Sequence, residues 1–256
     1  MRLINFASGS KGNSTLISVG DTHLLIDCGI SFRRLRQGLE SAGVPLASIG
    51  AVVLTHLHSD HAAGLPVWYR GSGMRFLAPE PVVRHSARIA GATAQDGRFS
   101  PLRVGESVRI GDINLDVFPV SHDAPETVGL RFAGNGKRLV YMTDLGTVSD
   151  ELPSLLEEQD LVFIEANHEP DLVASSSYPE RTKRRILSPR GHLSNQQALS
   201  LLSELVHPPS CVVFGHLSEN NNSPAIVAQR ADEFGLSARV ERVATASQCA
   251  PTSIEL

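Results

Sequence analysis

The sequence predicts a layered α/β sandwich with helices outside. Short apolar segments that read as strands and segments that read as helices follow one another through two consecutive halves of the chain. We find no internal repeat, linker or low-complexity segment. The 256 residues can bury a substantial core, so we expect one domain spanning residues 1–256.

Strands and helices of the first half are assigned from short apolar runs and from helix start and stop signals. The expected strands are residues 3–7, 15–19, 23–26, 49–54 and 74–78, and the expected helices are residues 31–42, 61–69 and 81–90. Ser31 is the expected N-cap of the first helix, and Gly43 is its expected stop. Residues 91–101 read as a loop.

The second half opens with strands and ends with helices between strands. The expected strands are residues 107–110, 113–119, 127–132, 137–141, 161–164, 211–214 and 238–243, and the expected helices are residues 179–187, 194–206 and 224–234. Asn135 and Gly136 form a strong hairpin signal between two of these strands, because this pair tolerates the left-handed conformations that a two-residue turn requires.

Composition and charge restrict the classes of function. Hydrophobic residues make up 41% of the chain and charged residues 20%, which fits a soluble globular protein. The formal net charge of −4 gives no overall basic field. This argues against non-specific nucleic-acid binding. A nuclease that holds phosphates through metals and a local basic patch stays compatible with it.

Cysteine usage and hydropathy predict the compartment. Cys28, Cys211 and Cys249 are isolated and form no CxxC pair, so we expect reduced thiols in the cytosol. The start of the chain has neither the apolar core nor the cleavage signal of a signal peptide, and no apolar run is long enough to cross a bilayer. We therefore expect a cytoplasmic protein without a membrane partner.

Residues 55–61, Thr-His-Leu-His-Ser-Asp-His, are the stretch around which the chain is organised. They follow a run that reads as a buried strand. His56 and His58 alternate along an extended segment, so they can point the same way. Asp60 and His61 are adjacent, so we expect them to diverge and to serve a second metal. Imidazole and carboxylate together suit zinc, manganese or iron.

Three later strands end in residues of the same kind. His122, Asp144 and His216 each follow an apolar strand that would bring them to the edge of a sheet. With the first stretch they make seven candidate ligands, which suits two ions. We expect His56, His58 and His122 to hold one ion, Asp60, His61 and His216 to hold the other, and Asp144 to bridge both. A water between the ions would ionise near neutral pH and become the nucleophile, and Asp60 could orient it.

Two further histidines are candidates for the site. His192 precedes Ser194, the expected N-cap of a helix, where exposed amide groups favour anions. We interpret His192 as holding the scissile phosphate or protonating the leaving oxygen, with a structural role as the alternative. His168 follows a buried strand. It is open whether His168 supports the ligands, contacts substrate or replaces one of the ligands.

A basic run lies directly before His192. Residues 181–190 carry five positive charges on an otherwise acidic chain, among them Lys183, Arg184 and Arg185. This run is the best candidate for a patch that follows the phosphates of a nucleic acid. The alternative is a solvated helix face.

Near the start of the chain, residues 8–14 form a small polar loop that loosely resembles a phosphate cradle. On that interpretation Ser10 and Asn13 contact substrate, and on the alternative the loop is a generic turn. Asp27 ends the third strand. It is either an N-cap or a carboxylate that supports the metal loop from behind, and we favour the second interpretation.

The ligand motif as a whole resembles a known signature. The motif His56-x-His58-x-Asp60-His61, followed by His122, Asp144 and His216, is similar to that of the metallo-β-lactamase superfamily. The resemblance spans nearly the whole chain. It implies an αββα sandwich with a dinuclear site at one edge, between the two sheets.

Narrower motifs resemble the YycJ/WalJ-type branch of that superfamily. They lie at residues 6–14, 121–124, 165–169, 191–195 and 216–221. This resemblance implies 5′→3′ exonuclease activity on DNA, and it adds Asn220 to the expected substrate contacts. The motifs at His192 and His216 also resemble those of ribonuclease Z. In that enzyme the earlier histidine assists phosphodiester cleavage and the later one binds metal, which implies the same roles here.

The leading hypothesis is a dinuclear metal-dependent phosphodiesterase that acts on nucleic acid, with DNA favoured over RNA as substrate. Zinc and manganese are the favoured metals, and iron also fits the ligands. The alternative is a small-molecule hydrolase, either a thioesterase similar to glyoxalase II or a small cyclic phosphodiesterase. A third hypothesis is a metal-stabilised binding protein without turnover. The sequence gives no indication of the oligomeric state.

Overall fold

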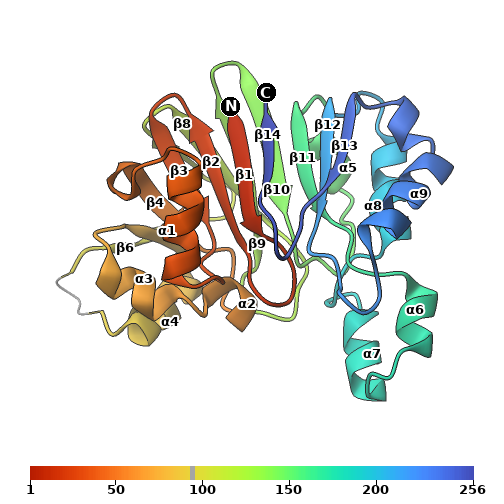
Figure 1. Cartoon of the computed structure of the whole chain (residues 1–256), viewed down its shortest axis with the longest axis horizontal. Coiled ribbons are helices and arrows are strands. Elements are labelled where there is room, and N and C mark those ends of the chain that lie inside the picture. Colours follow the sequence, from red (N-terminus) through yellow and green to blue (C-terminus); the bar gives the residue numbers. More distant parts are fainter. Residues whose placement is uncertain (93–95) are drawn as a thin grey trace.

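A computed structural model describes residues 1–92 and 96–256 of the chain. Two seven-stranded sheets pack face to face, and helices cover their outer faces (Figure 1). The strand order is β14-β1-β2-β3-β4-β5-β6 in the first sheet and β13-β12-β11-β10-β9-β8-β7 in the second. The predicted αββα sandwich is therefore confirmed.

The first sheet is built from the N-terminal half and closed by the C-terminal strand. Its strands are β1 (Arg2–Ala7), β2 (Ser14–Val19), β3 (Thr22–Ile26), β4 (Ile49–Val53), β5 (Phe76–Pro79), β6 (Phe99–Leu102) and β14 (Thr252–Glu255). Strands β3 to β6 are parallel, so their carboxyl ends share one edge. Strand β14 pairs antiparallel with β1.

The second sheet continues the chain from the first. Its strands are β7 (Ser107–Ile110), β8 (Ile113–Pro119), β9 (Val128–Gly134), β10 (Lys137–Met142), β11 (Leu161–Glu165), β12 (Cys211–Gly215) and β13 (Arg242–Thr245). Strands β10 to β13 are parallel, and their carboxyl ends also share one edge. Asn135 and Gly136 have φ angles of 51° and 70°, as the predicted hairpin turn requires.

Helices fill the outer layers. They are α1 (Phe32–Ser41), α2 (Ser59–Ala62), α3 (Leu65–Gly71), α4 (Glu80–Ala90), α5 (Leu152–Leu156), α6 (Pro170–Ser175), α7 (Glu180–Ile186), α8 (Asn195–Glu204) and α9 (Pro224–Glu233), with short 3-10 turns at Leu46–Ser48 and Leu236–Ala238. Helices α1, α3 and α4 pack on the first sheet. Helices α5, α8 and α9 pack on the second, so each outer face has its own apolar layer.

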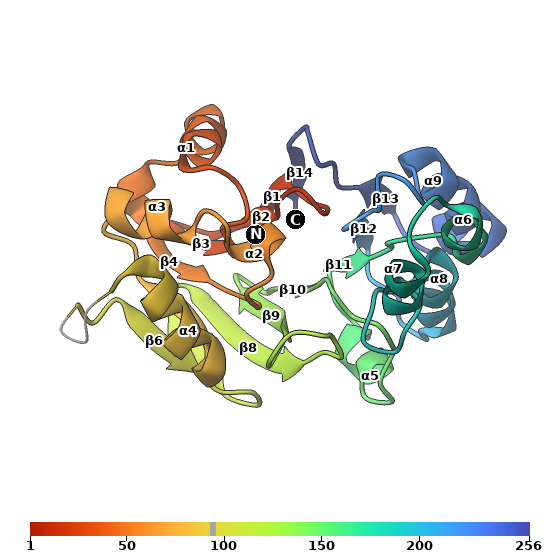
Figure 2. The ribbon, with the colours of Figure 1, turned by 90° about the horizontal axis from the view of Figure 1, so that it is seen from below.

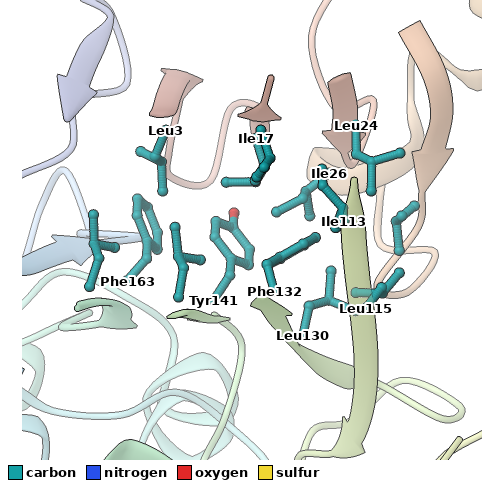
Figure 3. Packing of buried hydrophobic residues seen from close by; sticks show 14 of the residues in the cluster. Leu3, Ile17, Leu24, Ile26, Ile113, Leu115, Leu130, Phe132, Tyr141 and Phe163 are labelled. Carbon is teal, nitrogen blue, oxygen red and sulfur yellow. The ribbon is translucent and has the colours of Figure 1, made fainter. Parts of the chain in front are cut away.

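The central core lies between the two sheets (Figure 3). Leu3 and Ile17 of the first sheet face Tyr141 and Phe163 of the second, and the two aromatic rings stack 4.6 Å apart. This shared layer is apolar and closely packed, so it fixes how the two sheets stand against each other. The strand ends at the lower edge in Figure 1 are thereby held close together.

Some elements differ from their predicted form. The expected helix at residues 61–69 is two helices, α2 and α3, which break at Gly64, where a Cβ would lie 2.5 Å from the carbonyl oxygen of Cys28. Residues 91–101 are not all loop, because β6 begins at Phe99 and residues 93–95 lie outside the described part. The last predicted strand begins at Arg242, four residues later than expected.

Helices α5 and α6 and strand β14 had no predicted counterpart. Strand β14 contains one buried apolar side chain, Ile254, between polar neighbours, and its pairing with β1 defines it. Among the described residues, no helix combines the length and the apolar character that a membrane crossing needs.

Candidate metal centre

Loops at the carboxyl ends of the strands carry the candidate ligands. His56 and His58 follow β4, and Asp60 and His61 lie on α2, the short helix beside them. His122, Asp144 and His216 follow β8, β10 and β12. Because parallel strands bring their carboxyl ends to one edge, these loops from both sheets meet there.

The first ligand group joins the metal loop to the end of β8. One nitrogen each of His56, His58 and His122 lies within 4.8 Å of the others. Nδ1 of His58 is 3.1 Å from Nε2 of His122. These are the three residues that the sequence assigns to one ion.

A second group joins the metal loop to the end of β12. Ligand atoms of Asp60, His61 and His216 lie within 4.8 Å of one another. Nε2 of His216 is 3.3 Å and Nε2 of His61 is 3.6 Å from the same oxygen of Asp60. Asp60 and His61 therefore converge on one group, whereas they were expected to diverge, and both lie on the short helix α2.

Asp144 lies between the two groups. Its Oδ2 is 2.9 Å from Nε2 of His61, and its Oδ1 is 3.6 Å from Nε2 of His122. His56, His61 and Asp144 form a further group within 4.8 Å. This is where a carboxylate that bridges two ions would stand.

Unpaired polar atoms show that the groups fit cations. Within the described residues, Nε2 of His56 and Oδ2 of Asp144 are buried and take part in no hydrogen bond. The 2.9 Å approach of His61 to Asp144 lacks hydrogen-bond geometry. Buried nitrogen and oxygen atoms of this kind are costly unless a partner is bound, and these two belong to the ligand groups. The residues present therefore fit divalent metal ions.

In three of the candidate ligand histidines, a hydrogen bond holds the ring nitrogen that points away from the ligand group. Nδ1 of His61 is 2.7 Å from Asp27, Nδ1 of His122 is 2.9 Å from the carbonyl of Gly191, and Nδ1 of His216 is 2.8 Å from Glu165. With the proton on each Nδ1, the lone pair of each Nε2 faces its ligand group. Each ring is thus oriented for coordination.

Asp27 lies behind the metal loop. Its side chain is fully buried and accepts hydrogen bonds from the backbone N–H and the hydroxyl of Thr55 as well as from His61. Asp27, Asp144 and His216 all have left-handed backbones, with φ angles of 59°, 58° and 54°. This conformation costs a non-glycine residue roughly 1–2 kcal/mol. Its recurrence at three strand ends is typical of a functional site.

Glu165 is the buried acid that sequence reasoning did not assign. It ends β11, and its Oε1 lies 2.8 Å from Nδ1 of His216 and 2.9 Å from Nδ1 of His192. Its Oε2 accepts the backbone N–H groups of Leu145 and Leu193. The signal for it was the same as for Asp144, an acid at the end of an apolar strand. The sequence does not show that Glu165 contacts two histidines, because these contacts form only in the folded chain.

Two charged groups of the site have strongly shifted pKa values. Burial would raise the pKa of Glu165, but His192 and His216 outweigh burial and lower the pKa to about 2. Burial would lower the pKa of His61, but Asp144 and Asp27 outweigh it and raise the pKa to about 10. Glu165 is therefore ionised at neutral pH, and the acids around His61 favour a positive charge at that position.

Comparison with known proteins identifies the family. A family model described as “Beta-lactamase superfamily domain” matches residues 22–217, which include all the ligand groups. The chain belongs to this superfamily. Zn²⁺-bound PqqB from Methylobacterium extorquens has a similar fold, with a TM-score of 0.77, 18% identity and full coverage of both chains.

Two curated relatives in the superfamily cover most of the chain. “Exodeoxyribonuclease WalJ” of Streptococcus pneumoniae is 35% identical over 219 residues, which are 84% of this chain and 81% of the relative. “Exodeoxyribonuclease YycJ” of Bacillus anthracis is 31% identical over 217 residues, which are 84% of this chain and 82% of the relative. The similarity predicted from the narrower motifs is confirmed.

The polar loop at residues 8–14 is tied to the rest of the superfamily fold. The N–H groups of Gly9 and Lys11 donate to the side chains of Asn13 and Gln248. Asn13 is fully buried, and its amide also contacts Asp60 and His61. The geometry therefore favours a supporting role for Asn13 over the predicted substrate contact. Ser10 is exposed, so its predicted contact is sterically open.

His168 is brought near the site but does not join a ligand group. Its side chain is buried, and within the described residues its Nδ1 takes part in no hydrogen bond. Burial lowers the pKa of His168 to about 4, so the ring is neutral at pH 7. Asn220, on the loop after His216, is exposed and donates to the hydroxyl of Tyr178. Roles in substrate binding remain predictions for both.

Helices α6 and α7 project from the second sheet at the same end of the molecule as α2 (Figure 2). We call residues 170–191 the arm. Lys183 donates to the carbonyl of Ala174 within the arm. Arg184 is exposed and pairs with Glu180, four residues earlier. Arg185 instead pairs with Asp123, beside the first ligand group.

Gly29 is expected to be essential for the geometry of the metal loop. A Cβ at this position would lie 1.7 Å from the carbonyl oxygen of Asp60 and 2.7 Å from the backbone nitrogen of Asn13. Gly29→Ala should lower the free energy of unfolding by about 3 kcal/mol and weaken metal binding. Urea unfolding and metal titration test this. Gly73→Ala, where a Cβ meets nothing within 4 Å, is the control and should change neither.

Proposed function

We propose that the chain is a metal-dependent nuclease that removes nucleotides from the 5′ ends of DNA. The observation that carries the proposal is the convergence of two ligand groups on Asp144, with His192 beside them. Two relatives named exodeoxyribonucleases, 35% and 31% identical over 84% of the chain, support a DNA substrate.

The proposed ligands are those of the two groups described above. They are His56, His58 and His122 for one ion, Asp60, His61 and His216 for the other, and Asp144 for both. Zn²⁺ or Mn²⁺ fits this set, and iron is compatible with it. Two such ions would activate water for attack on phosphorus and neutralise charge on the phosphate. The remaining chemistry depends on the protein's own residues.

His192 is the proposed proton donor to the leaving oxygen. Its Nδ1 is 2.9 Å from Glu165 and 3.6 Å from Asp144. With Nδ1–H donated to Glu165, the Nε2 of His192 is left for substrate, and its side chain is 12% exposed. Glu165 accepts this hydrogen bond and so fixes the orientation of the ring. Asp60, 18% exposed, is placed to orient the attacking water.

The function is tested by cleavage of end-labelled DNA and RNA. Single- and double-stranded substrates are incubated with protein loaded with Mn²⁺ or Zn²⁺, and the Asp60→Ala/His61→Ala double variant runs alongside. Release of nucleotides from 5′ ends of DNA, lost in the variant, is the expected result. Cleavage of a thioester or a small cyclic phosphodiester, with nucleic acid untouched, would contradict the proposal and favour the small-molecule hydrolase. Metal-loaded protein that binds DNA and cuts nothing would favour a binding protein.

The exposed basic residues of the arm are proposed to follow the DNA backbone. Arg184→Ala should weaken DNA binding and reduce the slope of log K against log salt by about 1, as expected for one phosphate contact. The control is Arg84→Ala on α4. Arg84 pairs with Glu80, and Arg184 pairs with Glu180. In both pairs the charged atoms are 3.2 Å apart and the residues are four positions apart in the sequence. If the two variants show the same slope of log K against log salt, the proposal that the arm contacts DNA phosphates is wrong.

A further inference from the structure

The loop that carries His122 is fastened to the arm. Four contacts join residues 121–123 to residues 185–191. They are Ser121 Oγ to the carbonyl of Pro189 at 2.8 Å, Arg190 Nε to the carbonyl of His122 at 3.0 Å, His122 Nδ1 to the carbonyl of Gly191 at 2.9 Å, and Arg185 to the carboxylate of Asp123. Two arginines of the predicted phosphate patch therefore face the protein.

Asp123 lies between the arm and the first ligand group. Its Oδ1 is 3.4 Å from Nε2 of His58 and 3.4 Å from Nε2 of His122. Both of its oxygens also face the guanidinium of Arg185, with Nη2 at 3.1 Å from Oδ1 and Nε against Oδ2. A two-point pair of this kind fixes the orientation of the carboxylate as well as its position.

His58 differs from the other histidines in how its ring is oriented. His61, His122 and His216 turn Nε2 to their ligand groups and fix Nδ1 from behind. His58 turns Nδ1 toward the group, so its Nε2 is the atom that needs a partner. Among the described residues, Asp123 is the one acidic side chain recorded within 4.0 Å of that nitrogen. A ligand histidine whose second nitrogen meets a carboxylate is held in one tautomer and one orientation.

We propose that Asp123 is a positioning residue for His58 and that Arg185 acts through Asp123. The inference rests on the proposed function in one respect, the assignment of His58 and His122 as metal ligands. It changes the role predicted for Arg185, whose guanidinium is engaged by Asp123 and holds the ligand loop to α7. The arm thereby stabilises the first ligand group, while Arg184 remains free to meet substrate.

The test measures metal affinity and the geometry of the bound metal. Asp123→Ala, Asp123→Asn and Arg185→Ala are titrated with Zn²⁺ against a chelator of known affinity, and the absorption spectrum of the Co²⁺-loaded protein is recorded. Asp123→Ala should weaken binding of one ion by about 10–100-fold and change the Co²⁺ spectrum. Asp123→Asn, which keeps the shape and an acceptor, should fall between Asp123→Ala and the unchanged protein.

A double-mutant cycle tests whether Arg185 acts through Asp123. Arg185→Ala should weaken binding on its own but have no further effect in the Asp123→Ala protein, because the pair acts as one unit. Additive effects would overturn that part of the proposal. Arg131→Ala is the matched control, because it breaks an Arg–Asp pair of similar exposure, with Asp116, on β8 and β9. It should leave metal affinity unchanged.

A failure of this inference can be told apart from a failure of the ligand assignment. His58→Ala must weaken binding of one ion, since otherwise the ligand assignment is wrong. If His58→Ala weakens binding and both Asp123 variants leave affinity and spectrum unchanged, the positioning role is overturned and the ligand assignment stands. Unfolding midpoints of all variants in excess chelator should match that of the unchanged protein. If Asp123→Ala does not fold, Asp123→Asn and Arg185→Ala decide the question.

Discussion

Asp144→Ala is expected to lower the rate of DNA cleavage by at least about 10³-fold and to weaken binding of both metal ions. Among residues 1–92 and 96–256, Asp144 alone has oxygens near proposed ligands of both groups, at 2.9 Å from His61 and 3.6 Å from His122. A bound ion contributes several kcal/mol to the stabilisation of transition-state charge, and each 1.36 kcal/mol is worth a factor of ten in rate. Loss of the shared ligand should therefore exceed the loss of any ligand of one ion.

The measurement for Asp144→Ala is metal content per chain after dialysis, taken together with the cleavage rate. The unchanged protein should keep two ions, and the variant should keep fewer than one. Asp150→Ala is the control, because Asp150 is an exposed aspartate on the loop that follows Asp144. Two ions retained by the Asp144 variant, with activity lost, would show that Asp144 acts on substrate and is not a bridging ligand.

The cluster of candidate ligands was predictable because its signal is local. His56, Asp144 and His216 come shortly after strands whose carboxyl ends share one edge of a sheet. Strand β8, before His122, is antiparallel to β9 and so runs in the same direction as β10. His122, Asp144 and His216 were found in this way, although up to 94 residues separate them along the chain. The pattern of strands and helices predicts a layered α/β sandwich, and the resemblance to the superfamily adds that two sheets form its inner layers.

Contacts between distant segments could not be predicted in this way. Glu165 bonds His192 and His216, which are 27 and 51 residues away, and Arg185 bonds Asp123 across 62 residues. Composition suggested that the basic run faces phosphates, whereas the fold turns Arg185 toward the ligand loop. The sequence does not show which way a charged side chain points. Tertiary structure therefore decides which basic residues of the run face substrate and which contact the protein.

Local conformation explains the other differences. Asp60 and His61 converge and both lie on α2, and no strong cap residue marks a four-residue helix in the sequence. The left-handed backbones of Asp27, Asp144 and His216 also lack a sequence signal, since glycine is the residue that normally marks such positions. The surrounding hydrogen bonds and packing impose these conformations.

His192→Ala is expected to lower the rate of DNA cleavage by about 10²–10⁴-fold while both metal ions stay bound, because proton transfer to the leaving oxygen contributes a factor of that size. His192 pairs with Glu165 and lies beside the two proposed ligand groups, but it is not one of the seven proposed ligands. Metal content and cleavage rate are measured together, and His207→Ala is the control, because His207 is an exposed histidine outside every ligand group.

A second substrate decides between the two roles predicted for His192. Bis(p-nitrophenyl) phosphate releases a nitrophenolate that needs no proton, so a proton donor matters little for it. If His192 protonates the leaving oxygen, His192→Ala should slow this substrate by less than about tenfold while DNA cleavage falls by the full factor. Glu165→Gln should slow both, because Glu165 also holds His216, a proposed ligand. Equal losses on both substrates for His192→Ala would instead assign His192 to stabilising charge on the phosphate.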